Sequence, residues 1–385
     1  MSNNHISINP ALLTWARERA RLDEFALAHR FPKLAEWESG ESQPTLRQLE
    51  DFAHAVHVPI GYLFLPQPVK ETMPIPDFRT LSGRAVSRPS PNLLDTLYLC
   101  QQRQDWYQDH ARMHALPALR FIGSATTGDN PAAVAEDMRG TLQLSLAERQ
   151  QVSNWSEALR SFLTKTEDAG VLVMASGIVG SNSHRKLDVE EFRGFALADE
   201  LAPLVFLNAA DSKAAQMFTL GHELAHLWLG ESGVSDTEAG RLPEQVIERW
   251  CNAVAAELLM PMQATREAHQ PGLSLPEEIQ RLARQFKVST LVALRRLFDA
   301  GFINEVILWQ NYREELARIR AFNLRGGCGG DFYRTLGTRT GKRFARAVLA
   351  STLEGQTLFQ DAFRMLGVKK SATFYKAARE LEVIA

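Results

Sequence analysis

Two histidines and a glutamate lie close together in the segment His222-Glu223-Leu224-Ala225-His226. In a helix of 3.6 residues per turn, positions i and i+4 share a face, so both imidazoles can reach one ion while Glu223 points beside it towards a water. Neutral imidazole is a good zinc ligand, and a catalytic zinc takes three protein ligands and keeps one position open. The spacing therefore predicts a metal site that needs a third ligand from elsewhere in the chain.

The third ligand is expected in the segment PEQVIERWCNAVAAELLMP, which is residues 243–261. Glu248 stands 22 residues after His226, which is enough for a turn and a returning helix. Glu244, one helical turn earlier, competes with it. The spacing is similar to the gluzincin plan, in which HExxH is followed by a glutamate on a second helix. The residues alone leave both glutamates open.

Two helices must position these side chains. The first is predicted over DSKAAQMFTLGHELAHLWLG, with Asp211 or Ser212 placed to cap its first turn and Gly230 to end it. The second is predicted from about 243 to 260 and ends at Pro261, because proline cannot continue a helix.

A small sheet is predicted before the first of these helices. Residues 171–180, 192–199 and 202–209 are short segments rich in β-branched and aromatic residues, separated by Gly, Ser, Asn or charged clusters. Residues 275–320 and 340–382 have helical patterns again.

Three further residues are weaker candidates for chemistry. His184, in the loop SNSHRK, is a candidate for stabilising an oxyanion, and its simpler interpretation is a solvated loop histidine. Cys251, three residues after Glu248, is better explained as a small buried thiol than as a redox partner of the metal. Cys328, between glycines in GGCGG, could in principle bind the metal as an inhibitory thiolate, an interpretation that we do not favour.

The pairing of MFTLGHELAHLWLG with IERWCNAVAAELLMP resembles the ImmA/IrrE family of metallo-endopeptidases. The resemblance covers about 170–300, including LARQFKVSTLVALRRL after the second helix. It implies that His222, His226 and Glu248 bind one zinc ion, with Mn²⁺ or another divalent ion as the alternative, and that Glu223 is the general base. It prefers Glu248 over Glu244, because Glu248 stands four residues before an asparagine, as in the family motif.

The same resemblance implies a biological role. It implies an endopeptidase that cuts a transcriptional repressor or another regulatory protein, and so controls gene expression, a stress response, or mobile-element or toxin-antitoxin genes. A protein substrate is therefore the expected partner.

The N-terminus resembles an XRE-type helix-turn-helix over residues 9–65. The resemblance rests on Trp37-Glu38-Ser39-Gly40, followed by QPTLRQLEDFAHAVHVPIGYLFL. Only five residues separate the second helix, EFALAHRF, from Trp37, whereas a recognition helix needs a turn and about two helical turns there. The unit is therefore predicted to be degenerate, with protein docking or homodimer formation as its expected use.

Together these patterns predict an α+β protein that is mostly helical. Its small β-sheet packs on the HExxH helix of a zincin-like, gluzincin-type peptidase domain, flanked by modules like a helix-turn-helix. We expect a degenerate XRE-type helix-turn-helix at 1–68, a linker and helical scaffold at 69–165, an ImmA/IrrE-like metallopeptidase domain at 166–312 and a basic helical module at 313–385.

Composition excludes several classes of protein. The 385 residues are 45% hydrophobic and 23% charged, which fits a globular protein rather than a disordered or fibrous one. Three cysteines are too few and too scattered for a disulfide framework. The N-terminus has no basic stretch leading into an apolar run, and no later segment reaches the roughly 18 apolar residues that a membrane helix needs. We expect a soluble cytoplasmic protein with no membrane partner.

The net charge of −2 hides an uneven distribution. Residues 313–385 hold 14 basic and 7 acidic residues, whereas residues 1–70 hold 7 and 8. Because phosphate contacts require Lys and Arg, we expect any nucleic-acid binding to be weak, salt-sensitive and carried by the C-terminal module.

A rival interpretation comes from a different class of protein. The chain would then be a DNA-binding or toxin-binding, antitoxin-like regulator whose metal site is structural or idle. The enzyme requires an open fourth coordination position beside a cleft, and the rival requires a closed site or a sheet edge that is already covered.

Overall fold

The computed structural model describes residues 5–78, 88–235, 245–323 and 332–384. The chain divides into two compact units. The first unit comprises Met1–Pro74 and Arg84–Asp95, and the second comprises Ile75–Gly83 and Thr96–Ala385. The division of the chain into four domains is not tested by this result and stays a prediction.

The first unit is a small helical bundle around buried Leu12, Trp37 and Phe52. Its helices are α1 (Pro10–Arg19), α2 (Glu24–Ala28), α3 (Leu34–Ser39), α4 (Leu46–Ala55) and the 3₁₀ helix η1 (Ile60–Phe64). Helix α3 has six residues, which is less than two turns, and ends at Gly40 with a φ of 81°. The helix-turn-helix assignment stays a prediction.

The second unit contains a mixed sheet with strand order β1-β3-β2-β4. The strands are β1 (Leu172–Ser176), β2 (Gly194–Leu197), β3 (Leu204–Asn208) and β4 (Gly233–Ser235). Strand β3 pairs parallel to β1 and antiparallel to β2, which in turn pairs antiparallel to β4. The first three strands lie inside the predicted segments. Strand β4 was not predicted, because three residues are too few to show a period of two.

The remaining helices complete the second unit. They are α5 (Pro91–Met113), whose first turn belongs to the first unit, α6 (Pro131–Thr141), α7 (Leu146–Gln151), α8 (Trp155–Asp168), α9 (Lys213–Leu229), α10 (Val246–Leu259), α11 (Met262–Ala268), α12 (Leu275–Phe286), α13 (Thr290–Asp299), α14 (Glu305–Asn323), α15 (Phe332–Thr340), α16 (Lys342–Leu353), α17 (Phe359–Leu366) and α18 (Ser371–Glu380). The α+β prediction is confirmed. Among the described helices, none is long and apolar enough to cross a bilayer.

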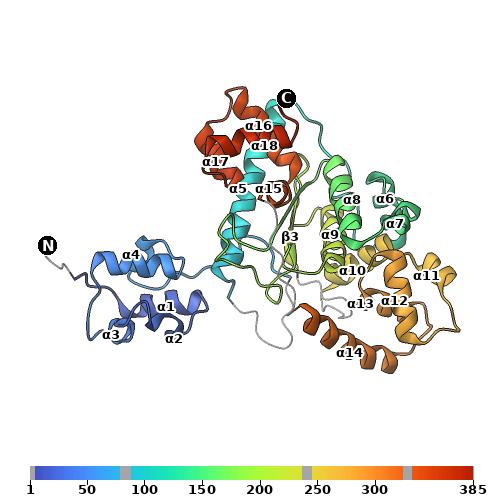
Figure 1. Cartoon of the computed structure of the whole chain (residues 1–385), viewed down its shortest axis with the longest axis horizontal. Helices are drawn as coiled ribbons and strands as arrows, with labels where there is room; N and C mark the ends of the chain where they lie inside the picture. The colour runs from blue at the N-terminus through green and yellow to red at the C-terminus, as the bar shows by residue number, and fades with distance from the viewer. Residues whose placement is uncertain (1–4, 79–87, 236–244, 324–331, 385) are drawn as a thin grey trace. The chain divides into compact units, whose positions relative to one another are not determined.

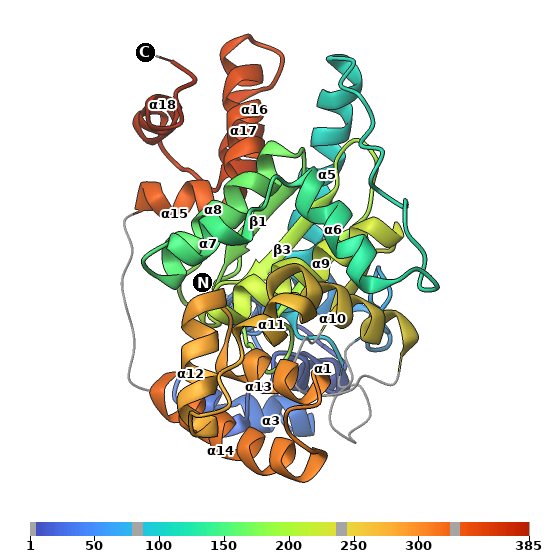
Figure 2. The ribbon, with the colours of Figure 1, turned by 90° about the vertical axis from the view of Figure 1, so that its right-hand side faces the viewer.

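The sheet lies between two layers of helices (Figure 1, Figure 2). On one face, Val173 and Ala175 of β1 join the large core that α8, α9 and α10 build. On the other face, Met174 contacts Cys100 and Arg103 of α5. Successive strand residues point to opposite faces, so a strand buried on both sides must be apolar at every position. All five residues of β1 are buried.

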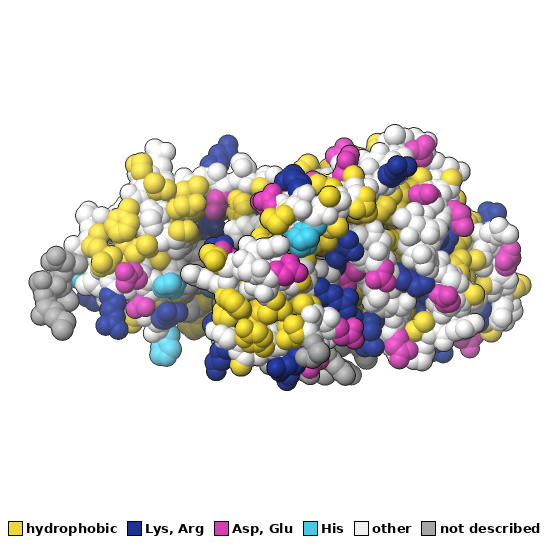
Figure 3. Space-filling view, turned by 90° about the horizontal axis from the view of Figure 1, so that it is seen from above, with side chains coloured by type: hydrophobic (Ala, Val, Ile, Leu, Met, Phe, Trp, Pro, Cys, Tyr) yellow, Lys and Arg dark blue, Asp and Glu magenta, His cyan; other side chains and the backbone are white. Residues whose placement is uncertain are grey.

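The C-terminal helices belong to this second layer. The Arg103 guanidinium donates to the Met365 carbonyl at 2.8 and 3.1 Å, which ties α5 to α17. A side chain at Gly341 would come within 2.8 Å of the Val173 carbonyl oxygen, so the turn between α15 and α16 presses directly on β1. Figure 3 looks down on the side that carries α16 to α18 and shows hydrophobic side chains gathered in a patch bordered by Lys and Arg.

Lys369 and Lys370, both exposed between α17 and α18, allow a test of nucleic-acid contact without deleting helices that cover the sheet. Reversing both charges should lower the affinity of the whole chain for duplex DNA and reduce the slope of log affinity against log salt by about two, since each lost phosphate contact removes roughly one counterion. Fluorescence anisotropy titrations at several salt concentrations measure both quantities. The matched control is Lys33→Glu/Arg47→Glu in the first unit. A larger loss of DNA affinity in this control than in the Lys369/Lys370 variant would contradict binding by the C-terminal module.

Glu167 of α8 supplies a pH-dependent contact with the C-terminal helices. Its carboxylate accepts the Arg343 backbone N–H at 3.1 Å. Burial raises the pKa of Glu167 to about 7, against hydrogen bonds from the Arg343 and Lys342 backbones that lower it. Because folding favours the neutral form, its contribution to stability is complete below the ordinary pKa of 4.5 and is lost as the pH rises through 7.

Glu167→Gln keeps an acceptor and stays neutral at every pH. We expect this variant to exceed the wild type in free energy of unfolding at pH 8 by up to about 3 kcal/mol and to match it near pH 4. Thermal unfolding followed by circular dichroism at both pH values checks this, with the exposed Asp168→Asn on the same helix as control. An equal effect of Glu167→Gln at both pH values would contradict the assignment.

Candidate metal centre

Helix α9 carries the two histidines, and its ends follow from its sequence. The Ser212 hydroxyl accepts the Ala215 N–H at the N-terminus, and Gly230 takes a left-handed conformation with a φ of 71° at the C-terminus. Ser212, rather than Asp211, is therefore the capping residue. Every residue from Gln216 to Trp228 is buried, because α9 lies between the sheet, α8 and α10.

The packing of α10 against α9 brings three ligand atoms together. Nε2 of His222 and Nε2 of His226 lie 3.1 Å apart, and the two carboxylate oxygens of Glu248 lie 3.3 and 2.9 Å from them. Two imidazole nitrogens and a carboxylate oxygen are the donor set that a divalent metal such as zinc accepts. Glu248 comes from the first turn of α10, which is the returning helix, and its role as the third ligand stays a prediction.

The protonation of these groups suits metal binding. Burial alone would raise the pKa of Glu248, but the charges and hydrogen bonds of His222 and His226 lower it to about 2, so the carboxylate is ionised. Burial lowers the pKa of His226, which keeps that imidazole neutral. Nδ1 of His222 lies 3.0 Å from Oδ1 of Asn252, so this nitrogen is assigned the proton and Nε2 faces the other ligands with a lone pair.

Glu223 lies beside the group of His222, His226 and Glu248 and is completely buried. Neither of its carboxylate oxygens has a hydrogen-bond partner in the described part of the chain. Burial is the main cause that raises the pKa of Glu223, the charge of Glu248 adds to it, and the nearby Ser235 hydroxyl opposes both. Burying a carboxylate without a hydrogen-bond partner costs free energy of folding. Its position beside the grouped residues therefore indicates a site that binds a metal ion and a water.

Glycine at position 194 lets β2 approach this carboxylate. A side chain there would come within 2.6 Å of the Thr219 methyl group and 3.1 Å of a Glu223 carboxylate oxygen. Strand β2 therefore forms one wall of the centre, and β4 places the buried Ser235 hydroxyl 3.4 Å from Nε2 of His226.

An aromatic residue from a distant part of the sequence completes the centre. The Phe78 ring stacks on the His226 imidazole, with 5.4 Å between ring centroids and 8° between the ring planes. Phe78 could not be predicted as a site residue, because it follows a proline-rich linker and has no spacing relation to the histidines. Gly194 and Ser235 could not be predicted either, because they reach the site only through pairing of the strands.

The other sequence candidates lie elsewhere. His184 is exposed in the loop between β1 and β2 and is not among the grouped ligand atoms. Cys251 is buried, and burial, followed by the charges of Glu248 and Glu223, raises the pKa of its thiol well above the ordinary value. Glu244 and Cys328 lie outside the described residues.

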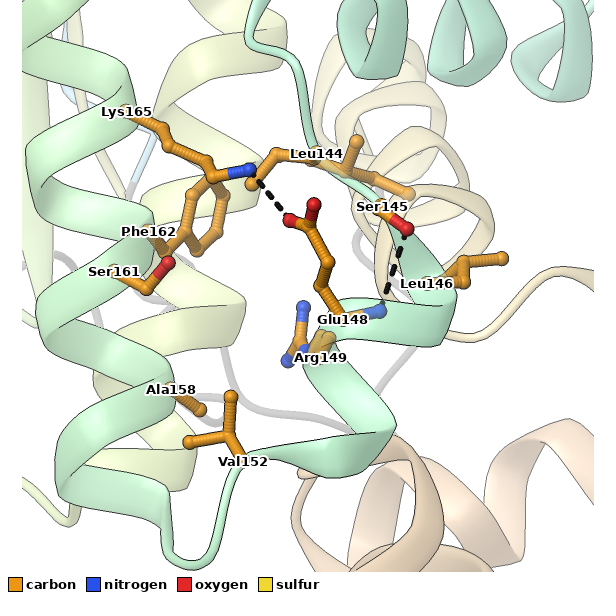
Figure 4. A pocket seen from close by; sticks show the side chains of 11 residues that line it. Leu144, Ser145, Leu146, Glu148, Arg149, Val152, Ala158, Ser161, Phe162 and Lys165 are labelled. Atoms are coloured by element: carbon orange, nitrogen blue, oxygen red, sulfur yellow. Dashed lines mark hydrogen bonds and ion pairs between the residues drawn. The ribbon is translucent and has the colours of Figure 1, made fainter.

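A small pocket of about 40 Å³ between α7 and α8 is separate from the metal centre (Figure 4). Glu148 pairs there with Lys165 at 2.9 Å, and the neighbouring Arg149 donates to the Lys287 carbonyl at 3.2 Å. None of the three grouped ligands lines this pocket. It contributes no group to the chemistry of the site.

The HExxH helix, the glutamate of the returning helix and the small sheet define a domain of the metallopeptidase class. Residues 166–298 match the family model described as the IrrE N-terminal-like domain, Peptidase_M78. The predicted resemblance to the ImmA/IrrE family is confirmed for this part of the chain. Residues 340–380 match a second family, described as a domain of unknown function (DUF8813).

Two curated relatives are similar over a shorter stretch. The radiation response metalloprotease IrrE of Deinococcus radiodurans is 34% identical over 101 residues, which is 25% of this chain and 31% of that protein. The protein of the same name from Deinococcus deserti is 35% identical over 101 residues, or 25% of this chain and 36% of that protein. The chain thus spans about a third of the length of the curated relatives that it matches.

Replacing any of the three grouped residues should remove bound metal. His222→Ala, His226→Ala and Glu248→Ala each delete one donor, and the remaining two hold an ion far more weakly. Metal content after dialysis against zinc, measured by atomic absorption, checks this. His269→Ala is the matched control, because His269 also pairs with a glutamate, Glu278, at 3.1 Å. Full zinc content in Glu248→Ala would point to Glu244 instead.

Proposed function

We propose that the chain is a zinc-dependent endopeptidase that cuts a regulatory protein in the cytoplasm. The observation that carries this proposal is the buried Glu223 carboxylate, without a partner among the described residues, beside the group of His222, His226 and Glu248. When bound there, zinc would act as a Lewis acid that polarises the scissile carbonyl and makes water acidic.

The roles of the protein's own residues follow from their positions. His222, His226 and Glu248 would hold the ion, and Asn252 would keep the first imidazole in the correct tautomer. The Glu223 carboxylate would take a proton from the attacking water and deliver it to the leaving amine as the peptide bond breaks. By distance and angle neither oxygen of this carboxylate has a hydrogen-bond partner among the described residues, and the Ser235 hydroxyl lies near enough to lower its pKa.

The expected substrate is a transcriptional repressor or another regulatory partner. This part of the proposal is supported by the IrrE-type domain and by the name of the two relatives, which are radiation response metalloproteases. A role in a stress response or in the control of mobile-element or toxin-antitoxin genes fits a peptidase fused to a bundle that resembles a helix-turn-helix.

One observation favours the rival function, a DNA-binding or toxin-binding regulator with an idle metal site. The metal centre is closed, since His222, Glu223 and His226 have 0% of their surface exposed and Glu248 has 2%. The outer edge of β4 is also covered, because Phe78 and Pro76 pair with Val234. The enzyme therefore requires that the segment with Pro76 and Phe78 can move off β4, whereas the rival function does not.

Glu223→Gln separates metal binding from catalysis. The variant removes the proton acceptor and leaves the ligands intact, so zinc content should stay at the wild-type value while cleavage falls at least 100-fold. The measurement is co-expression of either chain with the products of genes neighbouring its own, followed by mass spectrometry of the fragments. Glu231→Gln, an exposed carboxylate after α9, is the control. Cleavage by Glu223→Gln at the wild-type rate would show that another group is the base.

A further inference from the structure

A short extended segment, Ile75–Phe78, lies along the outer edge of β4, and we call it the strap. It forms a parallel bridge in which Asp77 is opposite Val234. The Val234 N–H donates to the Pro76 carbonyl at 3.0 Å, and the Phe78 N–H donates to the Val234 carbonyl at 2.9 Å. The strap therefore takes the main-chain positions that an added strand would use on this edge.

The strap also contacts the metal centre through one side chain. Its Phe78 ring lies flat on the ring of His226, whose Nδ1 is buried and has no hydrogen-bond partner among the described residues. Gly233 of β4 leaves the space for this ring, since a side chain at 233 would come within 2.2 Å of it. Both the main chain of the strap and its aromatic side chain thus fit β4 closely.

A protein substrate cannot reach a centre whose four functional residues are at most 2% exposed. We propose that the strap is a displaceable cover, and that an extended segment of the substrate replaces it on β4 when the centre opens. The substrate class that fits is an extended peptide that pairs with Val234 and carries an aromatic or large apolar side chain at the place of Phe78. This inference rests on the proposed function, because an idle site needs no opening.

The strap is connected along the chain to the first unit on both sides, so an event in that unit can move it. The described residues before it, up to Pro74, and those after it, up to Asp95, belong to the first unit. Arg19 of α1 holds Glu71 through two hydrogen bonds of 2.6 and 2.7 Å, so the chain is anchored to that unit four residues before the strap begins. A partner that binds the first unit can therefore pull on the strap through the chain itself.

The kinetics of metal exchange distinguish a cover from a group that only supports His226. A cover that must open for entry and exit slows loading and release by the same factor and leaves the dissociation constant unchanged. Removal of a group that only supports His226 would instead raise the dissociation constant for the metal and leave the loading rate unchanged. The probe is Co²⁺ alone, followed by its visible absorption during loading of the metal-free whole chain and during removal by a chelator.

We expect Phe78→Ala to speed loading and release equally, by about tenfold, as the loss of one aromatic contact allows. Gly233→Ala should act in the same direction, because it keeps Phe78 but leaves no room for its ring. Phe302→Ala is the matched control. The Phe302 ring stacks on His269, which is not one of the three grouped residues, with 3.9 Å between the ring centroids. This variant should change neither the loading rate nor the release rate. Unchanged rates in Phe78→Ala, or a higher dissociation constant at an unchanged loading rate, would overturn the proposal.

Hydrogen exchange gives a second readout that needs no metal. The amides of Phe78 and Val234 donate the two strap hydrogen bonds, so peptides containing them should exchange faster in Gly233→Ala than in the wild type. Equal exchange would show that the strap is a permanent strand, even if the protein bound no cobalt. A chain that exchanges as expected but cleaves no substrate would contradict the proposed function alone.

A reversible lock tests the direction of the effect. Neighbouring strands lie about 4.8 Å apart, within the range of Cα separations that a disulfide spans, so Asp77→Cys/Val234→Cys can be joined across the bridge. In a Cys328→Ser background, oxidation should slow cobalt loading at least tenfold, and reduction of the same sample should restore it. Equal loading in the oxidised and reduced samples would contradict a cover at this edge.

Discussion

The close packing of α9 on α10 is the contact on which the rest of the structure depends. It brings the His222 and His226 rings to the carboxylate on the next helix, and it leaves Glu223 with none of its surface exposed. Four ionisable groups in one buried cluster would cost several kcal/mol each if they stood alone. The cluster is tolerable because its members compensate one another and because a bound cation would add its own binding free energy to that of folding.

Local features of the sequence predicted the parts of the site that helices carry. The i, i+4 spacing of the histidines, the serine cap and the terminal glycine all act within a few residues, and the structure has α9 at Lys213–Leu229 as this pattern requires. The second helix ends before Pro261 for the same kind of local reason. The strands were recognisable from their continuous apolar runs, although their ends were placed one to four residues too far out.

The parts that could not be predicted depend on contacts between distant segments. Strand β4 has three residues and exists because β2 pairs with it. Phe78 reaches His226 across about 150 residues of chain, and only the main-chain bridge to β4 fixes its position. Gly194 shows its purpose only when Thr219 and Glu223 are seen against it. Sequence periodicity contains no information on such encounters.

The two-sided burial of the sheet has a consequence for where this protein can be cut or recombined. The stretch that matches the IrrE-type family, residues 166–298, contains the sheet and the helices of only one of its faces. Met174 and its neighbours on the other face are covered by α5, which precedes that stretch, and by the helices after α14, which follow it. The segment that is shared with relatives is therefore smaller than the segment that folds, and a chain trimmed to the shared part would present the apolar back of its sheet to water.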